Sequence, residues 1–145
     1  MYKFIQLSIF LENQKGNLFV VSDLLAKNDI NIKALLLADT SEFGILRLVV
    51  PDYKKAKEVL EEKHYIVKET PVIGAVVDDV PGGLSSVLKI LRDADIDLEY
   101  LYAIAYGEIG KAGLLFHTKD LDQLEEILLK KDIPLVPAEL IYNAE

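Results

Sequence analysis

The first part of the chain changes from an alternating to a helical pattern of apolar residues. From Phe4 to Leu11 the side chains alternate between the two sides of an extended segment, which predicts a strand. Residues 13–16 interrupt this pattern, and from Asn17 onward apolar side chains recur three or four positions apart. This spacing predicts a helix that ends at residues 28–29, where Asn and Asp stop the apolar repeat.

The remainder of the first half predicts three further strands and a second helix. Two apolar runs, at 30–38 and 45–50, predict strands joined by a polar turn. The second helix follows Asp52, which is the expected N-cap because it stands directly before the helical repeat. A short strand at 64–68 closes this half, so that the order of elements is βαββαβ.

The second half repeats the pattern of the first. Two segments, each running from a loop glycine into the strand after the next helix, align without a gap. A repeat of this length is one small domain present twice. The matching pairs are Gly16 with Gly82, Leu18 with Leu84, Ile30 with Ile96, and Leu35 with Leu101.

The repeat defines the expected fold class and domains. The second helix of the second half is displaced by two residues, which we attribute to an insertion at 111–119. We expect an α+β protein with two ferredoxin-like βαββαβ domains in tandem, at 1–70 and 71–145, each an antiparallel sheet with helices on one face. The elements predicted for the second half are strands at 72–77, 96–105 and 112–117, helices at 83–93 and 120–130, and a closing segment at 134–142.

Composition narrows the classes of partner. The net charge of -8 argues against nucleic acid, which requires a basic patch, and against an anionic membrane surface. The chain has no cysteine, which excludes disulfides, thiolate nucleophiles and thiolate metal sites. Its apolar runs are only strand-sized and its first residues lack the pattern of a secretory signal, so we expect a cytoplasmic protein.

The two strand–loop–helix junctions carry the best candidate chemistry. In the second, Pro81 stiffens the turn and Gly82 permits backbone dihedrals that other residues avoid. The helix that follows presents unpaired N–H groups and a partial positive charge, which suit a carboxylate. Acceptor oxygens for an ammonium group are available from Asn13, Asn31, Asp79 and Asp97. Together these groups suit a zwitterion; the alternative is that Asn13 and Asp79 only cap helices or stabilise turns.

Other residues give weaker indications of chemistry. His64 and His117 are the only histidines, and neither is near a carboxylate pair or a serine in the sequence. A core or surface role therefore explains them better than catalysis. Asp78 and Asp79 point to opposite sides of a strand end, so we expect no metal site there. We expect no cofactor.

The second loop resembles that of a known family. Asp79, followed by Pro81-Gly82-Gly83-Leu84 and then Ile96-Asp97-Leu98, resembles the ACT domain, a small βαββαβ regulatory module that binds amino acids at domain interfaces. The whole chain resembles the tandem ACT proteins, in which two modules stand alone without an attached enzyme. The first loop departs from the family pattern, since Lys15 stands where proline is common and Asn17 replaces the second glycine.

The resemblance implies a set of ligand-binding residues. It matches two polar side chains in each copy to ligand contacts in the ACT domains of a biosynthetic dehydrogenase. They are Asn13 and Asn31 in the first copy and Asp79 and Asp97 in the second. Leu11 and Val77 stand where that enzyme has a histidine, so that contact is missing here. The predicted set is Asn13, Gly16, Asn17, Leu18, Asn31, Asp79, Pro81, Gly82, Gly83, Leu84 and Asp97.

The resemblance and the loop chemistry lead to one functional hypothesis and two alternatives. We expect a non-catalytic module that senses a free amino acid at the interface of two ACT domains and regulates amino acid metabolism. Its partners would be that amino acid, a second copy in a homodimer, and an enzyme that the sequence does not identify. The first alternative is a regulatory or assembly subunit that binds an enzyme through sheet edges and has no ligand. A small-molecule enzyme ranks third, because we can name no nucleophile–base pair.

Overall fold

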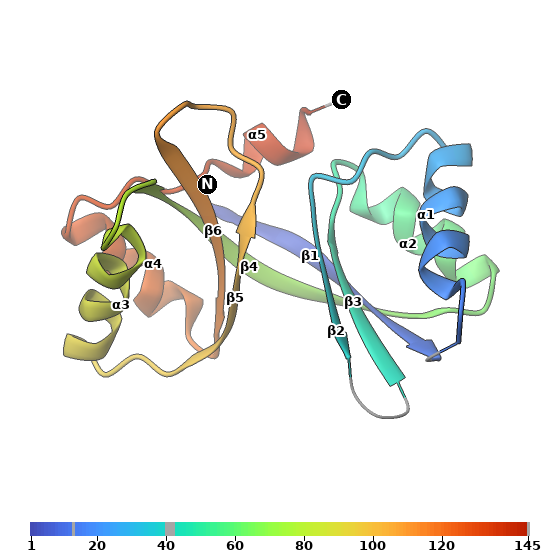
Figure 1. Cartoon of the computed structure of the whole chain (residues 1–145), viewed down its shortest axis with the longest axis horizontal. Helices are drawn as coiled ribbons and strands as arrows, with labels where there is room; N and C mark the ends of the chain where they lie inside the picture. The colour runs from blue at the N-terminus through green and yellow to red at the C-terminus, as the bar shows by residue number, and fades with distance from the viewer. Residues whose placement is uncertain (13, 40–42, 145) are drawn as a thin grey trace. The chain divides into compact units, whose positions relative to one another are not determined.

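A computed structural model describes residues 1–12, 14–39 and 43–144 and confirms the fold class predicted from the sequence. Helices alternate with strands that pair antiparallel, as two ferredoxin-like units require (Figure 1). The predicted ligand residue Asn13 lies outside the described residues.

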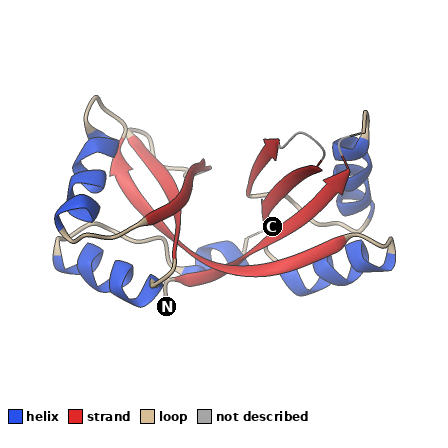
Figure 2. Ribbon diagram, turned by 90° about the horizontal axis from the view of Figure 1, so that it is seen from below, coloured by secondary structure: helices blue, strands red, loops and turns tan. Residues whose placement is uncertain are grey.

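The chain folds into two compact units. The N-terminal unit comprises Ile5–Thr70 and Ile141–Glu145, and the C-terminal unit comprises Met1–Phe4 and Pro71–Leu140. Helices of each unit lie on one face of its strands (Figure 2). The last residues of the chain therefore belong with the first repeat, although they follow the second in the sequence.

The N-terminal unit has strands in the order β2-β3-β1-β4 and two helices (Figure 1). The β1–β3 register runs from Leu7↔Leu48 to Glu12↔Phe43, which places apolar residues of both strands on the helical face. The Asp52 side chain accepts from the Lys55 N–H at 3.1 Å, which confirms the predicted N-cap. The elements are β1 (Lys3–Glu12), α1 (Asn17–Lys27), β2 (Ala34–Asp39), β3 (Phe43–Val49), α2 (Tyr53–Glu62) and the start of β4 (Ile66–Asp78).

The core of this unit follows from the two-residue repeat of its strands and the three-to-four-residue repeat of its helices. Every second residue of β1 from Leu7 to Leu11 is buried, and so are Val21 and Leu25, which lie four positions apart on α1. The apolar face of the strand packs against the apolar stripe of the helix. Both surfaces are thereby removed from water, which stabilises the fold.

The C-terminal unit has the corresponding order β5-β6-β4. A closing strand is reduced here to an isolated antiparallel bridge between Ala75 and Leu135. Two hydrogen bonds flank it, from Val76 N–H to Pro134 O at 2.8 Å and from Val136 N–H to Gly74 O at 2.7 Å. The elements are the end of β4, α3 (Gly83–Asp93), β5 (Leu98–Ile104), β6 (Lys111–Thr118), α4 (Leu121–Lys130) and the first residues of α5 (Ala138–Tyr142).

Strand β4 is continuous, and the prediction of two separate strands at 64–68 and 72–77 is wrong. Pro71 lies inside this strand, which runs through both units. Proline lacks an N–H group and is tolerated in a strand only where that donor is not needed. His64 is not in the strand at all, because it adopts a φ of 69° just after α2.

The two-residue insertion lies in the turn between β5 and β6, earlier than the predicted position at 111–119. In the first repeat, Ala38 pairs with Ile45, which leaves the six residues 39–44 between them. In the second, Ile104 pairs with Gly113, which leaves the eight residues 105–112. The strand pairing, which the sequence does not display, is what locates the insertion.

Candidate ligand-binding site

The two loop glycines have the same backbone conformation. Gly16 precedes α1 with a φ of 90°, and Gly82 precedes α3 with a φ of 87°. Both values lie in the left-handed region that glycine adopts without strain. Neither helix has a side-chain hydrogen bond capping its N-terminus. Each loop thus leads into a helix end whose N–H groups can bind an anion.

The next position distinguishes the two loops. A Cβ on Gly83 would overlap the carbonyl oxygen of Asp78, so only glycine fits there. In the first repeat Asn17 stands at this position, and its Nδ2 donates to Glu12 O at 2.6 Å. Glu12 corresponds to Asp78, so the same carbonyl is approached by a Cα atom in one loop and by an amide group in the other.

The second loop borders a cavity of about 570 Å³, which we call the C-terminal pocket. This volume lies within the range of small-molecule sites. Its walls come from the end of β4, the Pro81–Gly83 loop, the turn between β5 and β6, and the segment Asp132–Pro134 after α4. All of these segments belong to the C-terminal unit. Strand β5 itself contributes no lining residue.

Charged groups from three of these walls meet in the C-terminal pocket. Lys111 Nζ donates to Asp78 Oδ1 at 2.5 Å, and Glu108 and Asp132 also line the cavity. This hydrogen bond, with the charge of the same carboxylate, raises the pKa of Lys111, while burial opposes the shift. Lys111 is therefore a cation at neutral pH. The pocket combines carboxylate acceptors, one ammonium donor and a helix N-terminus.

Some predicted residues line the C-terminal pocket and others do not. Pro81, Gly82 and Gly83 line it. Asp79 does not, and its backbone N–H donates to Gly110 O at 3.0 Å. Leu84 is also outside the lining, with 42% of its surface exposed.

The helix after each loop separates the remaining predicted residues. Asn31 follows the C-terminal end of α1, whereas Gly16, Asn17 and Leu18 are at its start. An eleven-residue helix is roughly 16 Å long, since each residue adds 1.5 Å. In the second repeat, Gly82 precedes α3 and Asp97 follows its C-terminal end. One unit therefore does not bring the loop glycine and the residue after the helix together.

The sequence prediction missed the charged residues of the C-terminal pocket. Tyr106 and Glu108 belong to the turn between β5 and β6, Lys111 is the first residue of β6, and Asp132 follows α4. The two-residue insertion between the repeats was the available signal, because it lengthens the turn that reaches this cavity. Asp78 was considered in the sequence only as a metal ligand.

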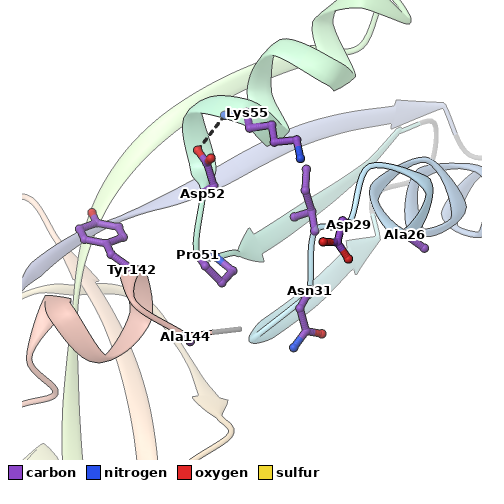
Figure 3. A pocket seen from close by; sticks show the side chains of 9 residues that line it. Ala26, Asp29, Asn31, Pro51, Asp52, Lys55, Tyr142 and Ala144 are labelled. Atoms are coloured by element: carbon purple, nitrogen blue, oxygen red, sulfur yellow. Dashed lines mark hydrogen bonds between the residues drawn. The ribbon is translucent and has the colours of Figure 1, made fainter.

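A second cavity lies in the N-terminal unit, beside the C-terminal end of α1 and the start of α2 (Figure 3). We call it the N-terminal pocket, and its volume is about 700 Å³. Asn31 lines it, together with Asp29 at the end of α1 and Asp52 and Lys55 at the start of α2. Lys55 Nζ donates to Asn28 O at 2.7 Å, which ties the two helix ends together. Tyr142 and Ala144 complete the wall.

Two kinds of feature are absent from the described residues. Residues 1–12, 14–39 and 43–144 contain no group of three or more His, Asp or Glu side chains placed to hold a metal ion. Within the same ranges, no helix has the length and apolar character needed to cross a membrane.

A family model described as the ACT domain pair matches residues 2–143. The chain belongs to this family. The ACT domain pair is a regulatory module, and the match extends over both repeats. The resemblance noted in the loop residues is thereby confirmed at the level of the family. A search of curated proteins found no match.

Solved structures share the ACT pair fold. A protein of Bacteroides thetaiotaomicron, BT0572, is 36% identical, with 99% of this chain and 98% of that chain covered and a TM-score of 0.91. The regulatory subunit of aspartate kinase from Thermus thermophilus is 12% identical, with 87% and 91% covered and a TM-score of 0.66. The Thermus flavus regulatory subunit is 14% identical, with 90% and 94% covered and a TM-score of 0.59. The two subunits from Thermus support the fold alone.

Proposed function

We propose that this ACT pair is a non-catalytic module that binds a free amino acid in the C-terminal pocket and regulates an enzyme of amino acid metabolism. The observation that carries the proposal is the uncapped N-terminus of α3, which borders a cavity lined by carboxylates. A zwitterion requires both kinds of group, donors for its carboxylate and acceptors for its ammonium.

The proposed arrangement assigns each end of the ligand to a different wall. The ligand carboxylate accepts from N–H groups at the start of α3, where the helix dipole favours negative charge. Its ammonium group is held by Asp78 and Glu108, and Lys111 offers a further donor to the carboxylate. Gly82 and Gly83 leave the backbone unobstructed by side chains at this point.

The remaining predicted residues fit a site completed by a second copy of the chain. Asn31 and Asp97 lie a helix length away from the loops of their own unit, so a homodimer would supply them from its other member. Gly16, Asn17 and Leu18 would form the corresponding loop of the N-terminal unit, and Asp79 and Leu84 the rim of the C-terminal one. Asn13 keeps its place in this proposed set on the sequence pattern alone.

A thermal-shift screen of the standard amino acids tests the proposal. A ligand present at about 100 times its dissociation constant should stabilise the chain by roughly 2.7 kcal/mol. For a chain of this size, that corresponds to a rise in Tm of roughly 5–10 °C. If every amino acid at millimolar concentration leaves Tm unchanged, the sensing function is wrong and the ligand-free assembly subunit becomes the better explanation.

A pair of variants locates the bound amino acid. Asp78→Asn should weaken its binding by about tenfold or more, because a charge-assisted hydrogen bond contributes about 1.5–3 kcal/mol. Asp93→Asn is the matched control, since Asp93 lies at the far end of α3 and pairs with Arg92. Equal affinities of the two variants in calorimetric titration would place the ligand elsewhere.

The ligand-free alternative has one observation in its favour. Edge strand β2 exposes two large apolar side chains, Leu35 at 48% and Leu37 at 46%. Such an edge suits protein contacts, whether to an enzyme or to a second copy.

A further inference from the structure

The end of the chain is docked on the N-terminal unit. The Tyr142 hydroxyl accepts a hydrogen bond from the Ile5 N–H of β1 at 3.0 Å. The rings of Tyr142 and Tyr53 have centroids 5.9 Å apart. Ile141 is 8% exposed, and Tyr142 and Ala144 form part of the wall of the N-terminal pocket (Figure 3). Removing these residues would open that pocket on one side.

The same segment of chain starts at the other pocket. Asp132, Ile133 and Pro134 line the C-terminal pocket. Immediately after them, the hydrogen bonds from Val76 N–H to Pro134 O and from Val136 N–H to Gly74 O hold the segment against β4. Its first anchor is therefore in the C-terminal unit, beside the proposed ligand.

The two anchors are joined by a short stretch of chain that contains one helix. Helix α5 begins at Ala138 in the C-terminal unit and ends at Tyr142 in the N-terminal unit. The Ala138 N–H donates to Met1 O at 2.9 Å, which fixes the start of this helix. Because few residues separate the anchors, we expect a displacement at one end to be transmitted to the other.

We propose that residues 132–144, which we call the C-terminal strap, couple the two pockets. A displacement of Asp132–Pro134 changes the docking of Tyr142 and with it the wall of the N-terminal pocket. Because equilibrium coupling is reciprocal, releasing Tyr142 also loosens the strap at the C-terminal pocket. The proposal goes beyond ligand sensing, since it concerns a connection that is present without any amino acid.

Amide hydrogen exchange, measured by NMR on the full chain without ligand, tests the coupling. Tyr142→Phe removes the acceptor for Ile5 while keeping the ring beside Tyr53. The Ile5 amide should exchange about fivefold faster, as expected for the loss of one ordinary hydrogen bond. The amides of Val76 and Val136 should also exchange faster, although they lie at the opposite anchor.

Two internal comparisons keep the result interpretable. Tyr65→Phe is the matched control, since it removes a tyrosine hydroxyl from the same unit outside the strap, and it should leave all three amides unchanged. The Val87 amide of α3 reports global opening, because Val87 is fully buried in the core of the C-terminal unit. Acceleration at Val76 and Val136 must exceed that at Val87.

Each of the other outcomes overturns the proposal. Faster exchange at Ile5 alone would show that Tyr142 docks locally and couples to nothing. Unchanged exchange at Ile5 would show that its hydrogen bond to Tyr142 does not hold the strap. Equal acceleration at all four amides would indicate only a loss of global stability. Since no amino acid is added, the result is independent of the thermal-shift screen.

Discussion

At the residue scale, the two glycines of the second loop differ in what they require. Gly82 needs a positive φ but has open space around its Cα, since a Cβ would meet no atom within 4 Å. Gly83 is buried within α3, where a Cβ would meet the backbone of Asp78. One glycine is therefore required by conformation and the other by contact.

Alanine substitutions should separate these two requirements. Gly82→Ala should lower the free energy of unfolding by about 1–2 kcal/mol, the cost of a left-handed conformation in a residue with a Cβ. Gly83→Ala should lower it by about 3 kcal/mol or more, because the rigid carbonyl of Asp78 must move. Chemical denaturation of both variants measures the difference. Equal costs would mean that the loop relaxes away from Gly83.

Tyr142 should respond to alkaline pH through its raised pKa. Burial raises the pKa of this hydroxyl, while the hydrogen bond from Ile5 acts in the opposite direction. The folded state therefore holds this proton more tightly than the unfolded state does. The resulting contribution to stability is present below the unfolded value near 10 and is lost as pH rises through the folded pKa.

An ultraviolet titration of tyrosinate formation measures this effect. Tyr142 should titrate later than a solvent-exposed tyrosine, and Tyr142→Phe should remove its share of the late component from the titration of the seven tyrosines. Tyr65→Phe should retain it. If the late component is undiminished in Tyr142→Phe, the pKa of this hydroxyl is not raised in solution.

At the element scale, the four longer helices end in the same way. The second residue beyond each of α1, α2, α3 and α4 has a positive φ between 56° and 69°. This left-handed residue stops a helix and turns the chain toward the next strand. None of the four is glycine, although glycine suits the conformation best. They are Asp29, His64, Asp95 and Asp132.

His64 therefore offers a stabilising substitution. His64→Gly should raise the free energy of unfolding by about 0.5–1 kcal/mol, since relief of the left-handed strain exceeds the added entropy of the unfolded chain. Lys63→Gly is the control, because Lys63 has a φ of -94° and gains nothing from glycine. A lower Tm for His64→Gly would show that the imidazole makes a compensating contact in solution.

At the scale of the whole molecule, the edge strands set the expectation for assembly. Strands β2 and β5 stand at the two ends of the strand order, so each has one side without a partner strand among the described residues. Unpaired edges with apolar side chains favour association. The homodimer predicted from the sequence stays a prediction. We expect its interface to include the exposed side chains of Leu35 and Leu37.

A charge on this edge should dissociate the dimer. Leu37→Lys should shift sedimentation at micromolar concentration toward the 16.2 kDa monomer, because a lysine at a sheet edge opposes edge-to-edge contact. Leu129→Lys is the matched control, since Leu129 is similarly exposed but lies on α4. A parent chain that is already monomeric would remove the basis for a site completed by a second copy.

The sequence alone determined the local structure and the family. Helix α3 occupies the predicted range 83–93, and Asp52 caps α2 as expected. These features depend on periodicity, caps and loop glycines, all of which act within a few residues. The loop residues around Gly82 also resemble those of the ACT family, to which the match over residues 2–143 assigns the chain.

Only the tertiary structure decided what depends on residues far apart in the sequence. In the structure the two predicted strands form one strand, β4, and the insertion lies in the turn between β5 and β6. Lys111 is hydrogen-bonded to Asp78. Tyr142 is docked against Ile5. No local pattern encodes these contacts, because hydrogen-bond geometry and burial are set by strand pairing and packing between segments that the chain brings together only on folding.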